Sequence, residues 1–132
     1  MNIKEETKGA LLKLSSWWGG HRPGYNGIAI KQDGTIIKYE VIHRFKELVE
    51  RVGMITPDDL EKLKNYLLYD EKVFETDYNT LVIMDSGVNV TINIDDKTRE
   101  IKNVAERYYR DNEDKLYDRL LKKVTDLQNS SK

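Results

Sequence analysis

The sequence contains no cysteine, which excludes disulfide scaffolds, cysteine zinc sites and cysteine nucleophiles. Its only histidines, His21 and His43, lie far apart and lack the spacing of a metal-binding motif. No apolar run approaches the roughly 18 residues of a membrane span, and the N-terminus lacks the apolar core of a secretory signal. We therefore expect no metal site, no membrane contact and a cytoplasmic location.

The chain also lacks an excess of charge of either sign. Its 132 residues include 22 Lys and Arg against 23 Asp and Glu, for a net charge of −1. Nucleic-acid-binding surfaces usually show as a basic excess, so we expect no nucleic-acid partner. A net charge near zero lowers the repulsion between copies, which permits a monomer or a weak homodimer. The length suits a single domain at 1–128 with a frayed tail at 129–132.

Alternation of apolar and polar residues predicts strands. Residues 25–32 and 35–43 are expected to form a hairpin around Asp33 and Gly34, because glycine tolerates the positive φ that tight turns need. The run from Ile37 to Val41 alternates cleanly, which is typical of a half-buried antiparallel strand. The same reasoning predicts further strands at 80–85, 88–94 and about 99–103.

Two segments show helical periodicity. Thr56 can cap a helix that begins at Pro57, and leucines recur after it at helical spacing, which predicts a helix at 57–68. A second amphipathic helix is expected from Asp111 or Asn112 to about residue 127.

Two other segments are ambiguous between strand and helix. Residues 8–17 fit either structure. In 44–54, four apolar residues are spaced like a helical stripe, so local spacing favours a helix, although a strand crossing to the next helix also fits.

Together these elements predict an α+β domain. We expect an antiparallel sheet of four to six strands with two amphipathic helices packed on one face, because strands joined by short turns pair antiparallel and amphipathic helices must bury their apolar side. The side chains expected to be almost fully buried are Leu63, Leu67, Ile83, Ile92, Leu120 and Val124.

Residues 17–25 form the most unusual stretch of the sequence. Three glycines and a proline predict an irregular loop, and its aromatic and arginine side chains are of the kinds that anchor interfaces. In a strand, the adjacent tryptophans would point to opposite sides, so one of them is expected in the core, and the sequence leaves open which. The expected partner contacts are Trp17, Trp18, His21, Arg22 and Tyr25.

Carboxylates are abundant but show no pattern of a site. Asp70, Glu71, Glu75 and Asp77 lack the alternating ligands and central glycine of a calcium loop, so we expect solvated surface charge. No serine has a nucleophile-elbow context, and no glycine pair precedes the lysine of a phosphate loop. The sequence therefore predicts no catalytic residue, no metal and no organic cofactor.

A glycine-rich turn ending in Pro and Tyr leads into an I-A-I-K-Q-D-G-T-I-I-K-Y hairpin, and G-M-I-T-P-D-D-L-E-K-L follows. This order of motifs resembles that of a group of small uncharacterised bacterial α+β domains. The layout is also similar to that of emfourin-type inhibitors of thermolysin-like proteases. The resemblance implies a sheet with helices on one face and favours a strand at 44–54, but it carries over no catalytic residue. The matching positions are Gly20, Pro23, Tyr25, Asp33, Gly34, Tyr39, Ile55, Leu60, Leu63, Asp77 and Ile83.

Three functions remain open from the sequence. The first is a non-enzymatic protein-binding or inhibitory module that uses residues 17–25. The second is a hydrolase-like enzyme that uses surface carboxylates. The third is a self-assembling structural protein of mobile-element origin, which would need a long unprotected edge strand.

Overall fold

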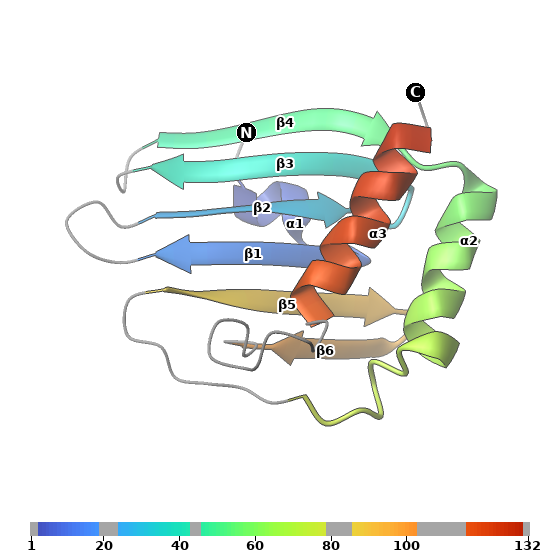
Figure 1. Cartoon of the computed structure of the whole chain (residues 1–132). Coiled ribbons are helices and arrows are strands. Elements are labelled where there is room, and N and C mark those ends of the chain that lie inside the picture. The colour runs from blue at the N-terminus through green and yellow to red at the C-terminus, as the bar shows by residue number, and fades with distance from the viewer. Residues whose placement is uncertain (1–2, 19–23, 43–45, 79–85, 103–115, 131–132) are drawn as a thin grey trace.

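The protein is an antiparallel sheet with helices on both faces. The computed structural model describes residues 3–18, 24–42, 46–78, 86–102 and 116–130. The six strands are hydrogen-bonded in the order β4-β3-β2-β1-β5-β6 (Figure 1). They are β1 (Leu12–Trp18), β2 (Gly24–Ile30), β3 (Thr35–Ile42), β4 (Lys46–Met54), β5 (Ser86–Ile94) and β6 (Lys97–Ile101). The helical elements are α1 (Ile3–Thr7), α2 (Pro57–Asn65), the π-helical turn η1 (Tyr66–Asp70) and α3 (Leu116–Ser130).

The predicted hairpin at 25–43 is confirmed as β2 and β3. Gly34 adopts a φ of 95°, which an L side chain rarely tolerates. The Thr35 amide donates to Asp33 Oδ1 at 2.9 Å, which holds the turn and lowers the pKa of the Asp33 carboxyl. Each strand pair in the sheet is antiparallel, as expected from the short connections.

Residues 46–54 form the edge strand β4, so the helix that local spacing favoured there is wrong. β4 pairs with β3 along its length, and the register shifts opposite Ile36 and Ile37. The shift leaves Val52 as an extra residue of β4. Side chains three apart in a strand point to opposite faces, so Val52 packs against the main core and Val49 packs against the other face. The apolar spacing of three therefore belongs to a strand that is partly buried on both faces.

The helix predicted at 57–68 is confirmed to Asn65 and continues as η1. The Asp59 amide donates to Thr56 Oγ1 at 3.2 Å, and Pro57 occupies the first turn, where no intrahelical donor is lost. The hydrogen bond from the Glu71 amide to the Tyr66 carbonyl, at 2.9 Å, closes the wider π turn.

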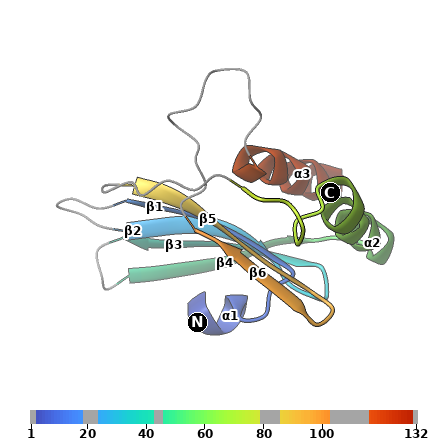
Figure 2. The ribbon, with the colours of Figure 1, turned by 90° about the horizontal axis from the view of Figure 1, so that it is seen from below.

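Helices α2 and α3 cover the same face of the sheet, as predicted, and Figure 2 shows them on one side with α1 on the other. The main core lies between these two helices and the sheet. Of the side chains expected there, Ile83 lies outside the described residues, and the others are at most 2% exposed: Leu63, Leu67, Ile92, Leu120 and Val124.

Helix α1 was not expected from the sequence. It closes a smaller cluster on the opposite face with Ile3, Ala10, Ala29, Tyr39 and Val41. Five residues are too few for a periodic apolar stripe, so no helical pattern marks this segment.

The remaining predictions concern the second half of the chain. The strands at 88–94 and about 99–103 correspond to β5 and β6, whereas the predicted strand at 80–85 and the helix cap at 111–112 lie outside the described residues. α3 continues through residues 129 and 130, the start of the expected tail. Among the described helices, none combines the length and apolar character that crossing a membrane requires.

Candidate functional site

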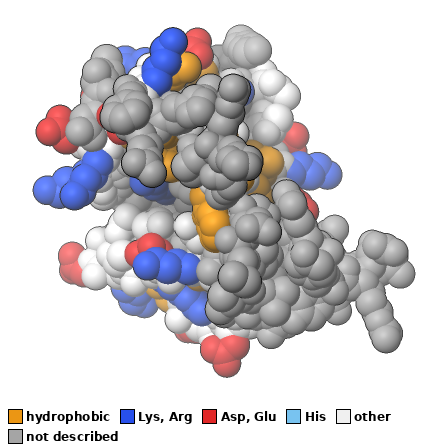
Figure 3. Space-filling model, turned by 90° about the vertical axis from the view of Figure 1, so that its left-hand side faces the viewer, with side chains coloured by type: hydrophobic (Ala, Val, Ile, Leu, Met, Phe, Trp, Pro, Cys, Tyr) orange, Lys and Arg blue, Asp and Glu red, His pale blue; other side chains and the backbone are white. Residues whose placement is uncertain are grey.

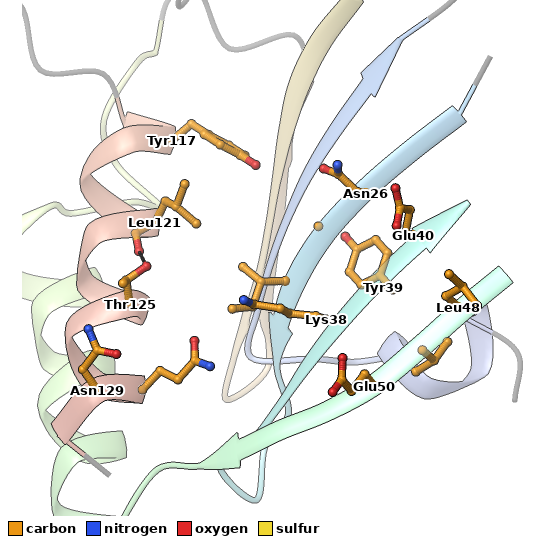
Figure 4. Close-up of a pocket in the computed structure, with 14 residues that line it drawn as sticks. Asn26, Lys38, Tyr39, Glu40, Leu48, Glu50, Tyr117, Leu121, Thr125 and Asn129 are labelled. Atoms are coloured by element: carbon orange, nitrogen blue, oxygen red, sulfur yellow. Dashed lines mark hydrogen bonds between the residues drawn. The ribbon is translucent and has the colours of Figure 1, made fainter. Parts of the chain in front are cut away.

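A groove opens beside α3, on the face of the sheet that α2 and α3 cover. α3 crosses the sheet obliquely and leaves part of β2, β3 and β4 uncovered (Figure 1). The space between α3 and these strands has a volume of about 880 Å³ (Figure 4). This falls within the range of about 300–1,000 Å³ that is typical of ligand sites.

The strands supply a polar floor to this groove. Because side chains alternate along a strand, Asn26, Lys38, Glu40 and Glu50 share the groove face. Cross-strand register places Asn26 opposite Glu40 and Lys38 opposite Glu50. The floor therefore presents hydrogen-bond donors and acceptors together with charges of both signs.

Apolar side chains line the middle of the groove. Ile28 is buried at its base, while Leu48 on β4 is 47% exposed. Across the groove, Tyr117 and Leu121 of α3 point toward the strands (Figure 4). Ile28 and Tyr117 are buried, so among these four side chains Leu48 and the partly buried Leu121 have the most exposed surface.

The C-terminal half of α3 adds polar groups along the same wall. Thr125 and Asn129 follow Leu121 at intervals of one helical turn, so they lie on the groove side (Figure 4). The Thr125 hydroxyl donates to the Leu121 carbonyl at 2.8 Å. This bond stays within the helix, so it leaves the polar edge of the groove accessible to a ligand.

The titratable side chains of the groove are Lys38, Tyr39, Glu40, Tyr117 and Glu50. Its described lining contains no serine, cysteine or histidine. Burial raises the pKa of Tyr39 far above its ordinary value, so this phenol stays protonated near neutral pH. Within the described ranges, no three His, Cys, Asp or Glu side chains are grouped so that they could hold a metal ion.

Trp18 lies on the groove face, at the end of β1. Register pairs Ser16 with Asn26 and Trp18 with Gly24, so the indole stands one pair beyond the polar floor. A Cβ added at Gly24 would lie 2.8 Å from Trp18 Cζ2, so only glycine leaves room for the indole there. Trp18 is partly exposed and, among the described contact residues that were predicted, it is the one on the groove face.

Trp17 and Tyr25 lie on the opposite face, together with Lys13. Tyr25 packs edge-to-face on Tyr39 with ring centroids 6.2 Å apart. Tyr25 and Lys13 also line a second hollow of about 750 Å³ beside α1. Trp17 and Trp18 are both partly exposed, so the expectation that one of them belongs to the core is wrong.

The predicted contact residues are therefore divided between the two faces of the sheet. His21 and Arg22 lie outside the described residues. At this end of the molecule, described side chains of both charges are interspersed (Figure 3). The groove itself was missed, because its residues come from β2, β3, β4 and α3 and no local motif links them.

Glu71 also departs from the sequence prediction, which expected solvated charge. Its side chain is only 10% exposed and forms an ion pair with Arg119, at 2.6 Å from Nε to Oε1. The Tyr66 and Tyr78 hydroxyls donate to the same carboxylate at 2.9 and 3.2 Å. Burial raises the pKa of Glu71, but the bonds from Arg119 and Tyr66 outweigh it and lower the pKa below its usual value. This network joins η1 to α3 and so fixes one wall of the groove.

Comparison with known proteins assigns no family. No protein-family model matches the chain, and no curated protein matches it with significant similarity. The resemblance to small bacterial domains and to emfourin-type inhibitors stays a prediction.

Proposed function

We propose that this chain is a non-enzymatic protein-binding domain that holds an extended segment of a partner in the groove between α3 and β2–β4. The observation that carries the proposal is the groove's composition. The side chains of Tyr117 and Leu121 on α3 face a floor of paired polar side chains on the strands. Such a surface can bury apolar side chains of a peptide while its polar groups fix the peptide's direction.

The position of Trp18 supports this proposal. The indole lies on the same face, next to the pair of Ser16 and Asn26, and it is partly exposed. Tryptophan contributes a large contact area at a small cost in conformational entropy, and it is enriched among residues that dominate binding energies. A peptide that leaves the groove toward the end of β1 would reach this side chain. In this proposal Trp18 remains a contact residue, whereas Trp17 and Tyr25 lie on the other face and do not contact the peptide.

The enzyme hypothesis has less support. Glu40 and Glu50 are the only carboxylates among the described groove residues, and neither directly faces the other across the strands. Register places Glu40 opposite Leu48 and Glu50 opposite Lys38. A carboxylate pair that works as acid and base needs both groups on opposite sides of one reacting bond. The floor instead presents each carboxylate beside a neutral or cationic neighbour.

A substitution that fills the groove with a large side chain tests the proposal. The variant Thr125→Trp places an indole on the groove side of α3, and Asp126→Trp adds the same side chain at an exposed position that does not line the groove. Peptides would be selected from a random displayed library on the wild-type protein. Their dissociation constants for the three proteins would then be measured by fluorescence anisotropy.

We expect Thr125→Trp to lower the affinity for the selected peptides by at least about tenfold, or 1.4 kcal/mol, and Asp126→Trp to leave this affinity unchanged. Amide chemical-shift changes on binding should fall on β2, β3 and the groove side of α3. The proposal is wrong if selected peptides bind both tryptophan variants as tightly as the wild type, or if the shifts fall on the α1 face.

A further inference from the structure

The two edge strands of the sheet differ in how much unpaired backbone they offer. β6 has five residues, whereas β4 has nine and lies at the other end of the strand order. β4 also carries Leu48 and Met54, which are 47% and 52% exposed and are two of the three exposed large hydrophobic residues among those described. A long edge strand with exposed apolar side chains is a template for pairing with another strand.

Symmetry restricts how two copies of β4 can pair. When the same edge of two molecules pairs antiparallel, the two-fold axis runs perpendicular to the sheet, and each face continues into the same face of the partner. Groove-face residues therefore oppose groove-face residues. Before the bulge at Val52, the groove face of β4 carries Leu48 and Glu50, and alternation adds Lys46.

The charges of β4 select among the symmetric registers. A register centred on Glu50 would place two carboxylates directly opposite each other, which is destabilising. A register centred on Leu48 places Lys46 of each copy opposite Glu50 of the other, forming two ion pairs. A register centred on Val49 pairs Glu47 with Arg51 twice but places each Leu48 opposite a glutamate. Exposed ion pairs contribute little to the stability of the dimer in either register. Only the register centred on Leu48 also removes the Leu48 side chain from water on both copies.

We infer that β4 is a homodimerisation edge, in which two copies pair antiparallel about Leu48 and form one continuous sheet. Neither Lys46 nor Glu50 forms an ion pair with another described residue, so these two charges are available to a partner. The net charge of −1 adds little repulsion between copies. The dimer would also bring the two grooves side by side on one face, since the two-fold axis preserves the faces.

Charge reversal tests the pairing and its register. Lys46→Glu alone and Glu50→Lys alone each place like charges opposite each other, and the double variant restores opposite charges. Glu47→Arg, with or without Arg51→Glu, is the matched control on the other face. Dimer dissociation constants would be measured by sedimentation equilibrium, with circular dichroism to check the fold of each variant.

We expect each single reversal at 46 or 50 to weaken the dimer by at least about tenfold and the double reversal to return its dissociation constant to near the wild-type value.

Cysteine cross-linking tests the register separately. Because the chain contains no cysteine, Leu48→Cys and Val49→Cys give unambiguous disulfide cross-linking. Cross-linking at position 48 and not at 49 supports the register. A wild-type protein that stays monomeric at millimolar concentration, cross-linking at 49 in preference to 48, or a double reversal no tighter than the single ones would overturn the inference. The groove test is independent, because Thr125 lies on α3.

Discussion

The two faces of the sheet are built on different principles. Among the described residues, the face under α2 and α3 buries nineteen aliphatic and aromatic side chains in one cluster, whereas the α1 face buries five. The larger cluster is closed by amphipathic helices with an apolar stripe. The smaller cluster is organised around one phenol, Tyr39, whose hydroxyl donates to the Leu14 carbonyl at 3.2 Å and is hydrogen-bonded to Ser15.

The two clusters are therefore expected to contribute differently to the free energy of unfolding and to the precise fit of side chains. The large cluster contributes most of the apolar burial, so it is expected to set the free energy of unfolding. The small cluster depends on fit: a Cβ added at Gly27 would lie 2.1 Å from the Leu14 carbonyl oxygen and 2.3 Å from the Tyr39 hydroxyl. Gly27 is therefore required for the close approach of Tyr39 to β1.

The largest effect is expected from Leu120→Ala in the main cluster. Leu120 is fully buried between α3 and the sheet, and truncating a buried leucine typically costs about 2–5 kcal/mol. Chemical denaturation monitored by circular dichroism measures the loss. Leu127→Ala, on the partly exposed C-terminal part of α3, is the control and should cost less. Equal losses for the two variants would show that α3 is not anchored through Leu120.

A smaller, pH-dependent effect is expected from Glu71→Gln on the helical side. Hydrogen bonds to charged groups contribute about 1.5–3 kcal/mol, and partial exposure of Arg119 favours the lower end. The pKa of Glu71 is lowered in the folded state, so its stabilisation is present above the unfolded pKa of about 4.5 and is lost as pH falls through the folded value. The difference in unfolding free energy between wild type and variant should therefore be full at pH 7 and shrink in acid.

Urea denaturation at several pH values between 7 and 3 measures this dependence. Glu75→Gln, at an exposed position in the same segment, is the matched control and should show no comparable difference. A difference between wild type and Glu71→Gln that stays constant down to pH 3 would contradict the assigned role of the carboxylate.

The smallest effect is expected from Tyr39→Phe on the α1 face. The substitution keeps the ring and removes only the hydroxyl, whose hydrogen bonds are worth about 0.5–1.5 kcal/mol. Combining it with Ser15→Ala should cost less than the two single losses added together, because both variants remove the same bond. Strict additivity of the two changes in unfolding free energy would show that the contact between Ser15 and Tyr39 contributes nothing.

The sequence predicted those elements whose signals are local. The turn at Asp33 and Gly34 and the helix start at Thr56 each depend on one or two neighbouring side chains, and both are confirmed. The alternation in β5 also correctly predicted that Val90 and Ile92 share one buried face.

Other features could not be predicted from the sequence because they depend on contacts between segments that are far apart in the chain. The apolar spacing in 44–54 matches a helix, but Val49 and Val52 pack on different faces of the edge strand β4, and only the pairing with β3 decides between the two structures. Glu71 was expected in solvent because its partner Arg119 lies far along the chain. The candidate groove was not foreseen for the same reason, and of the expected contacts that the structure describes, only Trp18 lies on its face.

The central position of β1 has a consequence for synthesis of the chain. β1 pairs with β2 on one side and with β5 on the other, yet β5 begins only at Ser86. While the ribosome is still adding the intervening residues, strands β1 to β4 can already form a meander whose β1 edge has no neighbour. That edge carries Leu12 and Leu14, which are buried in the finished protein. A chain that folds in this order would leave β1 unpaired along one side until β5 is synthesised, so we expect slow late folding and a benefit from chaperone protection at this stage.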